Sequence, residues 1–266
     1  MFRLFLIINR LSTGASMQVS KVVVITGSGR GIGAATAQLF ADHGYSVCLN
    51  YKSQAAPANE LALKLKSQGV SCLVVQADVA QEDDVIRLFE QVDKTLGPVS
   101  VLVNNAGILK QQMRLEEMTA ERINSVLINN VTSAFLCARE AVKRMSHKHG
   151  GKGGSIINVS SGAAKTGSPN EYVDYAASKA AMDAMTKGLS LEVAAEGIRV
   201  NGVRPGLIYT GMHADGGEAG RVDRLKEKIP MQRGGQPIEI AEAIYWLASD
   251  KSSFATGSYI DLMGGL

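Results

Sequence analysis

The stretch KVVVITGSGRGIG at residues 21–33 joins an apolar run to a glycine-rich turn. Residues 21–26 are apolar enough for a strand that is buried on both faces. Residues 32–43 then repeat apolar side chains at helical spacing and end at Gly44, a residue type that commonly terminates helices. Such a turn brings backbone N–H groups and a helix N-terminus close to a phosphate. The stretch therefore predicts a strand–turn–helix unit that binds a nucleotide phosphate.

The turn has the spacing TGxxxGxG, at residues 26–33, rather than GxGxxG. A Cβ atom at Gly27, Gly31 or Gly33 would block the approach of a phosphate or the packing of the helix on the strand. The other turn residues that we expect to contact the nucleotide are Ser28, Arg30 and Ile32. Some glycine turns merely reverse the chain, but a place after the first strand of a longer series favours phosphate binding.

Apolar runs and helical patterns alternate along the rest of the chain. The expected strands are residues 21–26, 46–51, 71–79, 99–104, 155–160, 198–203 and 258–262. The expected helices are residues 32–43, 59–68, 81–96, 119 to about 147, about 172 to 196, and 237 to about 249. Strands that are apolar on both faces and alternate with helices indicate a parallel sheet covered on both sides. We therefore predict an α/β fold: a single-domain, doubly wound, seven-stranded parallel sheet, Rossmann-like, with helices on both faces.

Two segments depart from this regular pattern. Residues 1–17 contain an apolar run at 4–8 that is too short for a typical secretory signal or a membrane span, and Met17 precedes the first strand. We expect an extension outside the fold, with a targeting peptide as the alternative, and one catalytic domain over residues 18–266. Residues 207–235 are rich in Gly, Met and charged side chains, which predicts a substrate lid rather than a solvated insertion.

Composition excludes several classes of function. The chain has 266 residues, of which 45% are hydrophobic and 20% charged, and its net charge is +3 with the basic residues scattered. These values argue against a nucleic-acid or membrane partner. Cys48, Cys72 and Cys137 lie in apolar runs without metal-ligand spacing, which predicts reduced thiols, no metal and a cytoplasmic protein.

The second strand bears on the choice of dinucleotide. It ends in Asn50, Tyr51 and Lys52, without the acidic residue that would bond the ribose 2′-hydroxyl of NAD. A carboxylate at this point would repel a 2′-phosphate, and its absence removes that penalty. Arg30 and Lys52 are expected to pair with the phosphate, although Arg30 alone also fits a solvated surface residue. The sequence therefore favours NADP(H) over NAD(H).

The stretch EYVDYAASKAA at residues 171–181 holds two tyrosines and one lysine. Tyr175 and Lys179 are four residues apart, so they share one face of a helix, whereas Tyr172 is about two turns from the lysine. An ammonium group beside Tyr175 favours its phenolate and so lowers its pKa, as a general acid–base tyrosine requires. A Tyr and a Lys at this spacing are common in helices, so the pair needs support from elsewhere in the chain.

Six motifs in the same order and spacing supply that support. They are TGxxxGxG at 26–33, NNAG at 104–107, Asn130, Ser161, YxxxK at 175–179 and PG at 205–206. With them the chain, from about residue 20 to its end, resembles the short-chain dehydrogenase/reductase family. Within that family it is most similar to bacterial NADP-dependent, glucose 1-dehydrogenase-like oxidoreductases, and also to 3-oxoacyl-[acyl-carrier-protein] reductases.

The resemblance implies a role for each catalytic position. Ser161 would hydrogen-bond the substrate oxygen, with the neighbouring Ser160 as its rival. Tyr175 would exchange a proton with that oxygen, and Lys179 would lower the pKa of Tyr175 and bind the nicotinamide ribose. Asn130 would bend its helix and hold a water that connects Lys179 to solvent, whereas Asn129 fits an ordinary helix residue.

The resemblance also implies where the cofactor and the substrate bind. Asp78 and Val79 would contact the adenine; Asn105, Ala106 and Gly107 would pass the adenine ribose; and Pro205, Gly206, Ile208 and Thr210 would grip the nicotinamide carboxamide. Candidates for the substrate pocket are Gly162, Ala163, Tyr172, Met212 and His213. A lone loop histidine such as His213 is more often simply exposed to solvent.

Together these features predict an NADP(H)-dependent oxidoreductase that acts on a small alcohol or carbonyl, sugar-like or other. One alternative is a 3-oxoacyl-[acyl-carrier-protein] reductase, for which Lys143, Arg144, His147 and Lys148 would form a basic docking patch rather than a solvated helix end. An alternative of another class is a non-catalytic NADP-binding scaffold or sensor. The family resemblance further implies a homotetramer or homodimer built through the two long helices and the last strand.

Overall fold

Seven parallel strands form one sheet in the computed structural model, which describes residues 20–266. The predicted extension at 1–17 lies outside the described residues. The strands are β1 (Val22–Ile25), β2 (Ser46–Tyr51), β3 (Cys72–Gln76), β4 (Val99–Asn104), β5 (Gly154–Val159), β6 (Ile198–Pro205) and β7 (Tyr259–Leu262). Their order is β3-β2-β1-β4-β5-β6-β7, with parallel pairing throughout. The predicted seven-stranded, doubly wound sheet is confirmed.

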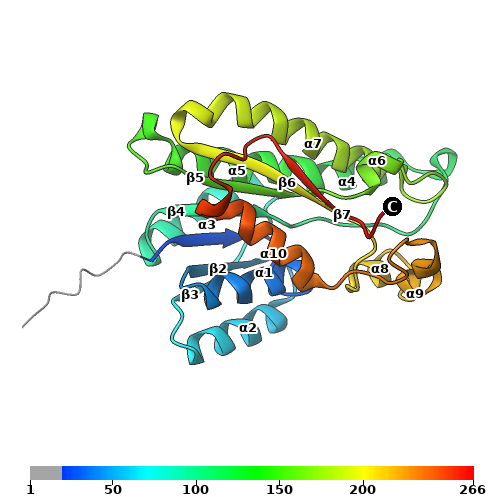
Figure 1. Cartoon of the computed structure of the whole chain (residues 1–266), viewed down its shortest axis with the longest axis horizontal. Coiled ribbons are helices and arrows are strands. Elements are labelled where there is room, and N and C mark those ends of the chain that lie inside the picture. Colours follow the sequence, from blue (N-terminus) through cyan, green and yellow to red (C-terminus); the bar gives the residue numbers. More distant parts are fainter. Residues whose placement is uncertain (1–19) are drawn as a thin grey trace, which may run out of the picture.

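Helices cover both faces of the sheet (Figure 1). One face carries α1 (Gly31–Asp42), α2 (Ala55–Ser67) and α10 (Pro237–Ala248), and the other carries α3 (Glu82–Thr95), α5 (Ser133–Met145) and α7 (Val173–Val193). Alternate residues of β1 belong to two separate cores. Val23 and Ile25 pack in the core on the side of α1, α2 and α10, and Val22 and Val24 pack in the core on the side of α3, α5 and α7. All four of these side chains are buried, which explains why the strand is apolar without a break.

The strand order places the functional crevice. From β1 the chain winds outward to β2 and β3, then crosses to the other side of β1 to form β4. The loops after β1 and β4 therefore diverge to opposite faces at the carboxyl edge of the sheet, which is the usual ligand site in such folds. The glycine turn at 27–30 follows β1, and the NNAG motif ends β4, so both lie at this edge.

The long helix predicted at 119–147 contains one irregular turn. It consists of α4 (Ala120–Leu127) and α5, joined by a π-helical turn at Ile128–Thr132 that holds the buried Asn130. A π turn interrupts regular helical bonding and often marks a functional site. The backbone irregularity predicted at Asn130 is therefore present. By contrast, α2 begins at Ala55 and not at residue 59, because Pro57 falls in the first turn, where no backbone N–H is needed.

The segment at 207–235 is a closed loop with its own short helices. It contains α8 (Met212–Asp215), α9 (Arg221–Leu225) and a 3₁₀ turn at Lys226–Lys228, so it is more regular than its composition suggested. Ile208 and Gly235 form an isolated parallel bridge that brings its two ends together. Figure 1 shows α8 and α9 beyond the carboxyl end of the sheet. Within residues 20–266, every helix is too short or too polar to cross a bilayer.

Candidate active site

The three glycines of the TGxxxGxG turn each have a separate structural reason. Gly27 and Gly31 have φ angles of +62° and +57°, which side-chain-bearing residues rarely adopt. At Gly33 a Cβ atom would lie 2.6 Å from the Gly27 carbonyl oxygen and 2.6 Å from Nδ2 of Asn105. At Gly29, outside the motif, the nearest atom to a Cβ would be 3.5 Å away. The motif therefore identifies the positions that need glycine.

Side chains behind the turn hold it in shape. The Gly27 N–H donates to Oδ1 of Asn50 at 3.2 Å, and the Ser28 N–H donates to the Asn50 carbonyl at 3.0 Å. Nδ2 of Asn105 donates to the carbonyls of Thr26 and Gly27 at 2.9 and 3.0 Å. The hydroxyl of Ser28 is buried and donates to the Asn50 carbonyl at 3.3 Å. Ser28, Asn50 and Asn105 thus support the turn from below, and the side chain of Ser28 is turned away from any ligand.

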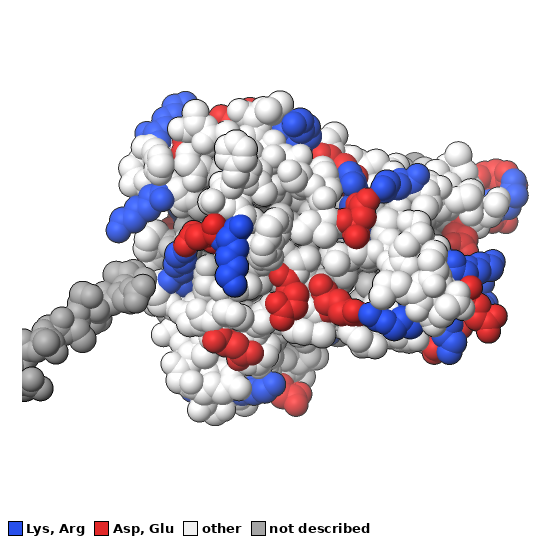
Figure 2. Space-filling view, in the orientation of Figure 1, with Lys and Arg blue, Asp and Glu red and all other residues white. Residues whose placement is uncertain are grey.

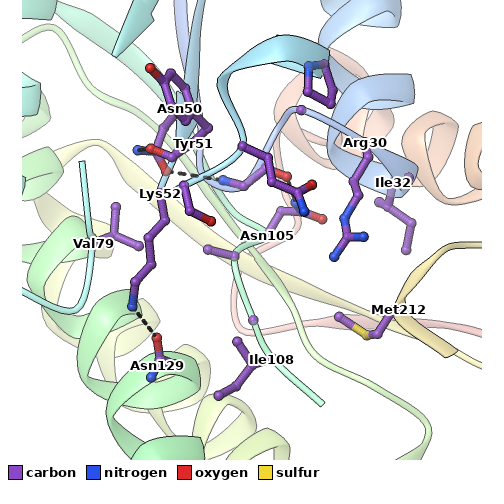
Figure 3. Close-up of a pocket in the computed structure, with 18 of the residues that line it drawn as sticks. Arg30, Ile32, Asn50, Tyr51, Lys52, Val79, Asn105, Ile108, Asn129 and Met212 are labelled. Carbon is purple, nitrogen blue, oxygen red and sulfur yellow. Dashed lines mark hydrogen bonds between the residues drawn. The ribbon is translucent and has the colours of Figure 1, made fainter. Parts of the chain in front are cut away.

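A cavity of about 320 Å³ opens in front of this turn (Figure 3). Its wall includes most of the predicted cofactor residues, namely Gly27, Arg30, Gly31, Ile32, Asn50, Tyr51, Lys52, Asp78, Val79, Asn105, Ala106, Gly107 and Thr210, together with Met212. Seven other residues predicted to bind the cofactor are not part of this wall in the described chain, namely Ser28, Gly33, Tyr175, Lys179, Pro205, Gly206 and Ile208. The cavity runs from the ends of β2 and β3 to Thr210, Gly211 and Met212 at the start of the segment 207–235.

Several wall residues escaped the sequence prediction. They are Gly29, Ser53, Gln54, Pro57, Ala77, Ile108, Asn129 and Gly211. Most of them are chain neighbours of predicted residues, so extending each motif by one or two positions would have found them. Asn129 is different: it was interpreted as an ordinary helix residue, yet it faces the cavity from the π-helical turn.

The two basic residues expected at the 2′-phosphate point to different sides of the cavity (Figure 3). Nζ of Lys52 lies 2.8 Å from Oδ2 of Asp78 and 3.3 Å from Oδ1 of Asn129. The guanidinium of Arg30 forms an ion pair with Asp215 of α8. Both cations line the cavity, but they have different partners, because Lys52 reaches across to the π-helical turn. Arg30 is the cation that remains next to the glycine turn.

Asn130 and Lys179 meet where the cavity wall reaches Gly107. A Cβ on Gly107 would lie 3.3 Å from Oδ1 of Asn130 and 3.5 Å from Nζ of Lys179. Asn130 accepts from the Ile108 N–H at 2.7 Å and donates to the Ile108 carbonyl at 3.1 Å. Nζ of Lys179, which is only 3% exposed, donates to the Val159 carbonyl at 2.8 Å. The ammonium is thereby fixed at the end of β5.

The two serines that follow β5 have different surroundings. Ser160 is buried, and its hydroxyl donates to the Lys179 carbonyl at 3.1 Å. Ser161 accepts from the Ala163 N–H at 3.1 Å, and its side chain is close enough to the Tyr175 hydroxyl to lower the pKa of that hydroxyl. The geometry therefore places Ser161, and not Ser160, beside Tyr175.

Burial dominates the ionisation of Tyr175 and Lys179. Burial raises the pKa of Tyr175 to about 12, against the opposing effect of the hydrogen bond with Ser161. Burial lowers the pKa of Lys179 to about 8, opposed by Asp183. The predicted lowering of the Tyr175 pKa by Lys179 is therefore wrong here, although Nζ lies only 5.7 Å from the centre of the tyrosine ring. Tyr175 is neutral at physiological pH, the state that a proton donor needs.

Residues of the predicted lid, 207–235, pack onto the chain just before α7. Tyr172 is 4% exposed, and its hydroxyl donates to the Gly216 carbonyl at 3.4 Å. A ring nitrogen of His213, Nε2, lies 3.1 Å from the Ile208 carbonyl, and burial lowers the pKa of His213. Nδ1 of His213 is buried and has no hydrogen-bond partner among the described residues. His213 is therefore not the solvent-exposed loop residue that its sequence context suggested.

The remaining predicted positions lie where the chain enters the predicted lid and at the end of β5. The Gly206 N–H donates to the Leu262 carbonyl at 2.9 Å, and a Cβ there would meet Met263 at 2.9 Å. Gly162 donates its N–H to the Pro205 carbonyl at 2.8 Å, and Ala163 opens the short helix α6 (Ala163–Thr166). These contacts join the ends of β5, β6 and β7 beneath the lid.

Comparisons with known proteins agree with this geometry. The family profile described as enoyl-(acyl carrier protein) reductase matches residues 27–266. An uncharacterized oxidoreductase of Escherichia coli K12, YgfF, is 59% identical over 92% of this chain and 99% of its own. The 3-oxoacyl-[acyl-carrier-protein] reductase FabG of Staphylococcus aureus Mu50 is 35% identical over 94% of this chain and 99% of its own.

Solved structures of this kind also match. A short-chain dehydrogenase of Burkholderia cenocepacia J2315 in complex with NADP has a TM-score of 0.85 and 29% identity, over 93% of this chain and 98% of that one. A Serratia marcescens short-chain dehydrogenase/reductase double mutant has a TM-score of 0.85 and 32% identity, with the same coverage. The chain is therefore an oxidoreductase that belongs to the short-chain dehydrogenase/reductase family.

Proposed function

We propose that this protein is an NADP(H)-dependent oxidoreductase that interconverts a hydroxyl and a carbonyl group on a small, sugar-like or other, substrate. The observation that carries the proposal is the placement of Ser161 beside the neutral Tyr175, with Lys179 and Asn130 close to Gly107 of the cavity wall. A scaffold or sensor would need the cavity but not these four side chains. The NADP in the Burkholderia relative supports the choice of cofactor.

The residues present fit the cofactor: the turn that opens onto the cavity has glycine at Gly27, Gly31 and Gly33, where a Cβ would be strained or would clash with neighbouring protein atoms. When bound, NADPH supplies the hydride for reduction. Ser161 and Tyr175 would both bond the substrate oxygen, and Tyr175 would give its proton to that oxygen as the negative charge develops. Lys179, with a pKa of about 8, would stabilise the resulting phenolate and return a proton to it.

Substitution of Arg30 tests most directly whether the protein prefers NADP over NAD. The charge of Arg30 would pair with the 2′-phosphate, and β2 ends without an acid. We expect Arg30→Ala to weaken NADPH binding about 10-fold or more and to leave NADH binding within about twofold, since a charge-assisted bond to a charged group contributes ~1.5–3 kcal/mol. Asp215→Asn, which releases Arg30 from its ion pair, should strengthen NADPH binding. Equal losses for NADPH and NADH in fluorescence titrations of Arg30→Ala would contradict this assignment.

The acyl-carrier-protein alternative is supported by relatives that carry its name, but the docking surface expected for it is weak. FabG of S. aureus carries the name of that activity. Of the four residues of the predicted patch, however, Lys143 and Arg144 pair with Glu140 at 2.8 and 2.9 Å, and Arg144 also pairs with Asp93 at 2.7 Å. These acids offset the charge that an acidic carrier would need.

The assay that separates the candidates is NADPH oxidation with a panel of ketones, aldehydes, sugars and acyl thioesters. We expect turnover with small carbonyl compounds. Turnover confined to acyl thioesters would favour the carrier-protein reductase. NADPH binding without oxidation in any reaction of the panel would favour the scaffold.

The oligomeric state, partners and location that we propose are those expected for the family. A groove between α5 and α7, lined by the half-exposed Phe135 together with Met185 and Leu189, supports assembly into a homodimer or homotetramer. On the face shown in Figure 2, basic and acidic side chains of the described chain are interspersed, which argues against a nucleic-acid partner. A cytoplasmic location fits the three buried thiols, and the reaction proposed here takes a small-molecule substrate.

A further inference from the structure

A buried ion pair joins α4 to the first turn of α7. Nε of Arg122 lies 2.8 Å from Oδ2 of Asp174, and Nη2 lies 3.4 Å from Oδ1. The side chains are only 11% and 1% exposed. Taking two charges out of water is costly, so a buried pair of this kind is weak evidence for stability and invites a search for what it fixes in place.

The same guanidinium holds a third segment. Nη1 of Arg122 donates to the Gln111 carbonyl at 2.6 Å and lies 3.8 Å from the sulfur of Met113. The Met113 N–H in turn donates to the Glu171 carbonyl at 3.0 Å, just before α7. Only the planar fork of an arginine reaches a carboxylate and a carbonyl in different directions at once, so lysine cannot replace it.

The two partners of Arg122, Asp174 and Gln111, both lie next to parts of the site that we assign to the substrate. Oδ1 of Asp174 also accepts from the backbone N–H of Tyr175 at 2.9 Å. The segment held by Arg122 is the one on which the lid rests: a Cβ on Gly217 would lie 3.4 Å from Gln111, and Gln112 donates to Glu218 at 2.7 Å. Arg122 therefore contacts two things at once. One is the segment at 111–113, which touches the lid, and the other is Asp174, which bonds the backbone of Tyr175.

We infer that Arg122 is a positioning residue that sets the lid support, residues 111–113, relative to Tyr175. It acts through Asp174 and the Gln111 carbonyl. This inference rests on the proposed function, because it assigns Arg122 to the substrate step and leaves the nucleotide step to the glycine turn. A shift of about 1 Å at a reacting group can cost on the order of 100-fold in rate, which is the scale of effect available to such a residue.

The test compares three variants with a matched control. Arg122→Lys keeps the charge but loses the fork, Asp174→Asn keeps the shape but loses the charge, and Arg122→Met removes both. For Arg122→Lys and Asp174→Asn we expect kcat/KM for the carbonyl substrate to fall about 10- to 100-fold while KM for NADPH stays within about twofold. The control is Arg199→Lys, since the Arg199 guanidinium bonds the carbonyls of Leu247, Ala248, Ser249 and Ala255 at the opposite edge of the sheet. Arg199→Lys should lower the free energy of unfolding. It should not lower kcat/KM for the carbonyl substrate selectively, relative to its effect on KM for NADPH.

Hydrogen exchange supplies a second measurement that needs no substrate. In Arg122→Lys, amides at 111–113 and 216–218 should exchange faster, whereas those at 27–33 should not change. Unchanged exchange at both segments, or equal changes in the two kinetic constants, would overturn the inference. If the wild-type protein reduces no carbonyl, the proposed function fails, and the exchange experiment alone decides on Arg122. If Arg122→Met does not fold, the two conservative variants still decide.

Discussion

Replacing Tyr175 by phenylalanine should lower kcat by at least about 1,000-fold while leaving NADPH affinity within about twofold. The hydroxyl is the proton donor in the proposed reaction, and a positioned general acid contributes ~10²–10⁴-fold. Steady-state turnover and a fluorescence titration with NADPH measure the two quantities on the same sample.

Ser160→Ala is the matched control for this experiment, because the Ser160 hydroxyl bonds the Lys179 carbonyl and not Tyr175. It should lower activity far less than Tyr175→Phe. Equal losses in the two variants would mean that the region responds to packing rather than to the loss of a proton donor.

Replacing Gly33 by alanine should disrupt the nucleotide turn. The new Cβ would lie 2.6 Å from the Gly27 carbonyl oxygen and 2.9 Å from Cα of Ser28, both of them backbone atoms, so the turn itself must move. Overpacking of this kind costs ~1–3 kcal/mol of unfolding free energy, and a displaced turn cannot present its N–H groups to a phosphate. We expect NADPH affinity to fall at least about 10-fold, and denaturant unfolding to show the lower stability.

The neighbouring Gly29 provides the control for stability. A Cβ there would find its nearest atom at 3.5 Å, an ordinary contact, and its φ is not among the left-handed ones. The free energy of unfolding of Gly29→Ala should stay within about 0.5 kcal/mol of the wild type. If Gly33→Ala were as stable as Gly29→Ala, the close packing of helix α1 on the turn would not be a constraint on the sequence.

The fold was predictable because local rules and long-range packing agree. The uninterrupted apolar β1 is explained by two cores, one on each face of the sheet, and the glycine spacing is explained by φ angles and one close contact. The irregularity at Asn130 was predicted, as a bend in the helix, through a family resemblance and not from helix periodicity, and its π-helical form was not predicted. The helices inside 207–235 were not predicted, since four- and five-residue helices leave almost no periodic signal.

Many of the residues predicted for the site lie together in the structure, but their pKa values and ion pairs were predicted less well. Spacing brings Tyr175 near Lys179, yet spacing carries no information on burial, which reverses the expected direction of the Tyr175 pKa. In the same way, the sequence shows that Lys52 is basic but not that Asp78 and Asn129 lie within its reach. Both misses arise because desolvation and long-range ion pairs depend on residues that are distant in the chain.

The most direct test of the proposed reaction follows deuterium from C4 of labelled NADPH into a carbonyl compound that the panel identifies as a substrate. We predict an alcohol with one deuterium on the former carbonyl carbon when the wild-type protein is used, and almost none with Tyr175→Phe. Mass spectrometry of the product measures both. Deuterium transfer that is undiminished in Tyr175→Phe, or NADPH that binds to the wild type but passes no deuterium to any carbonyl, would contradict the assignment.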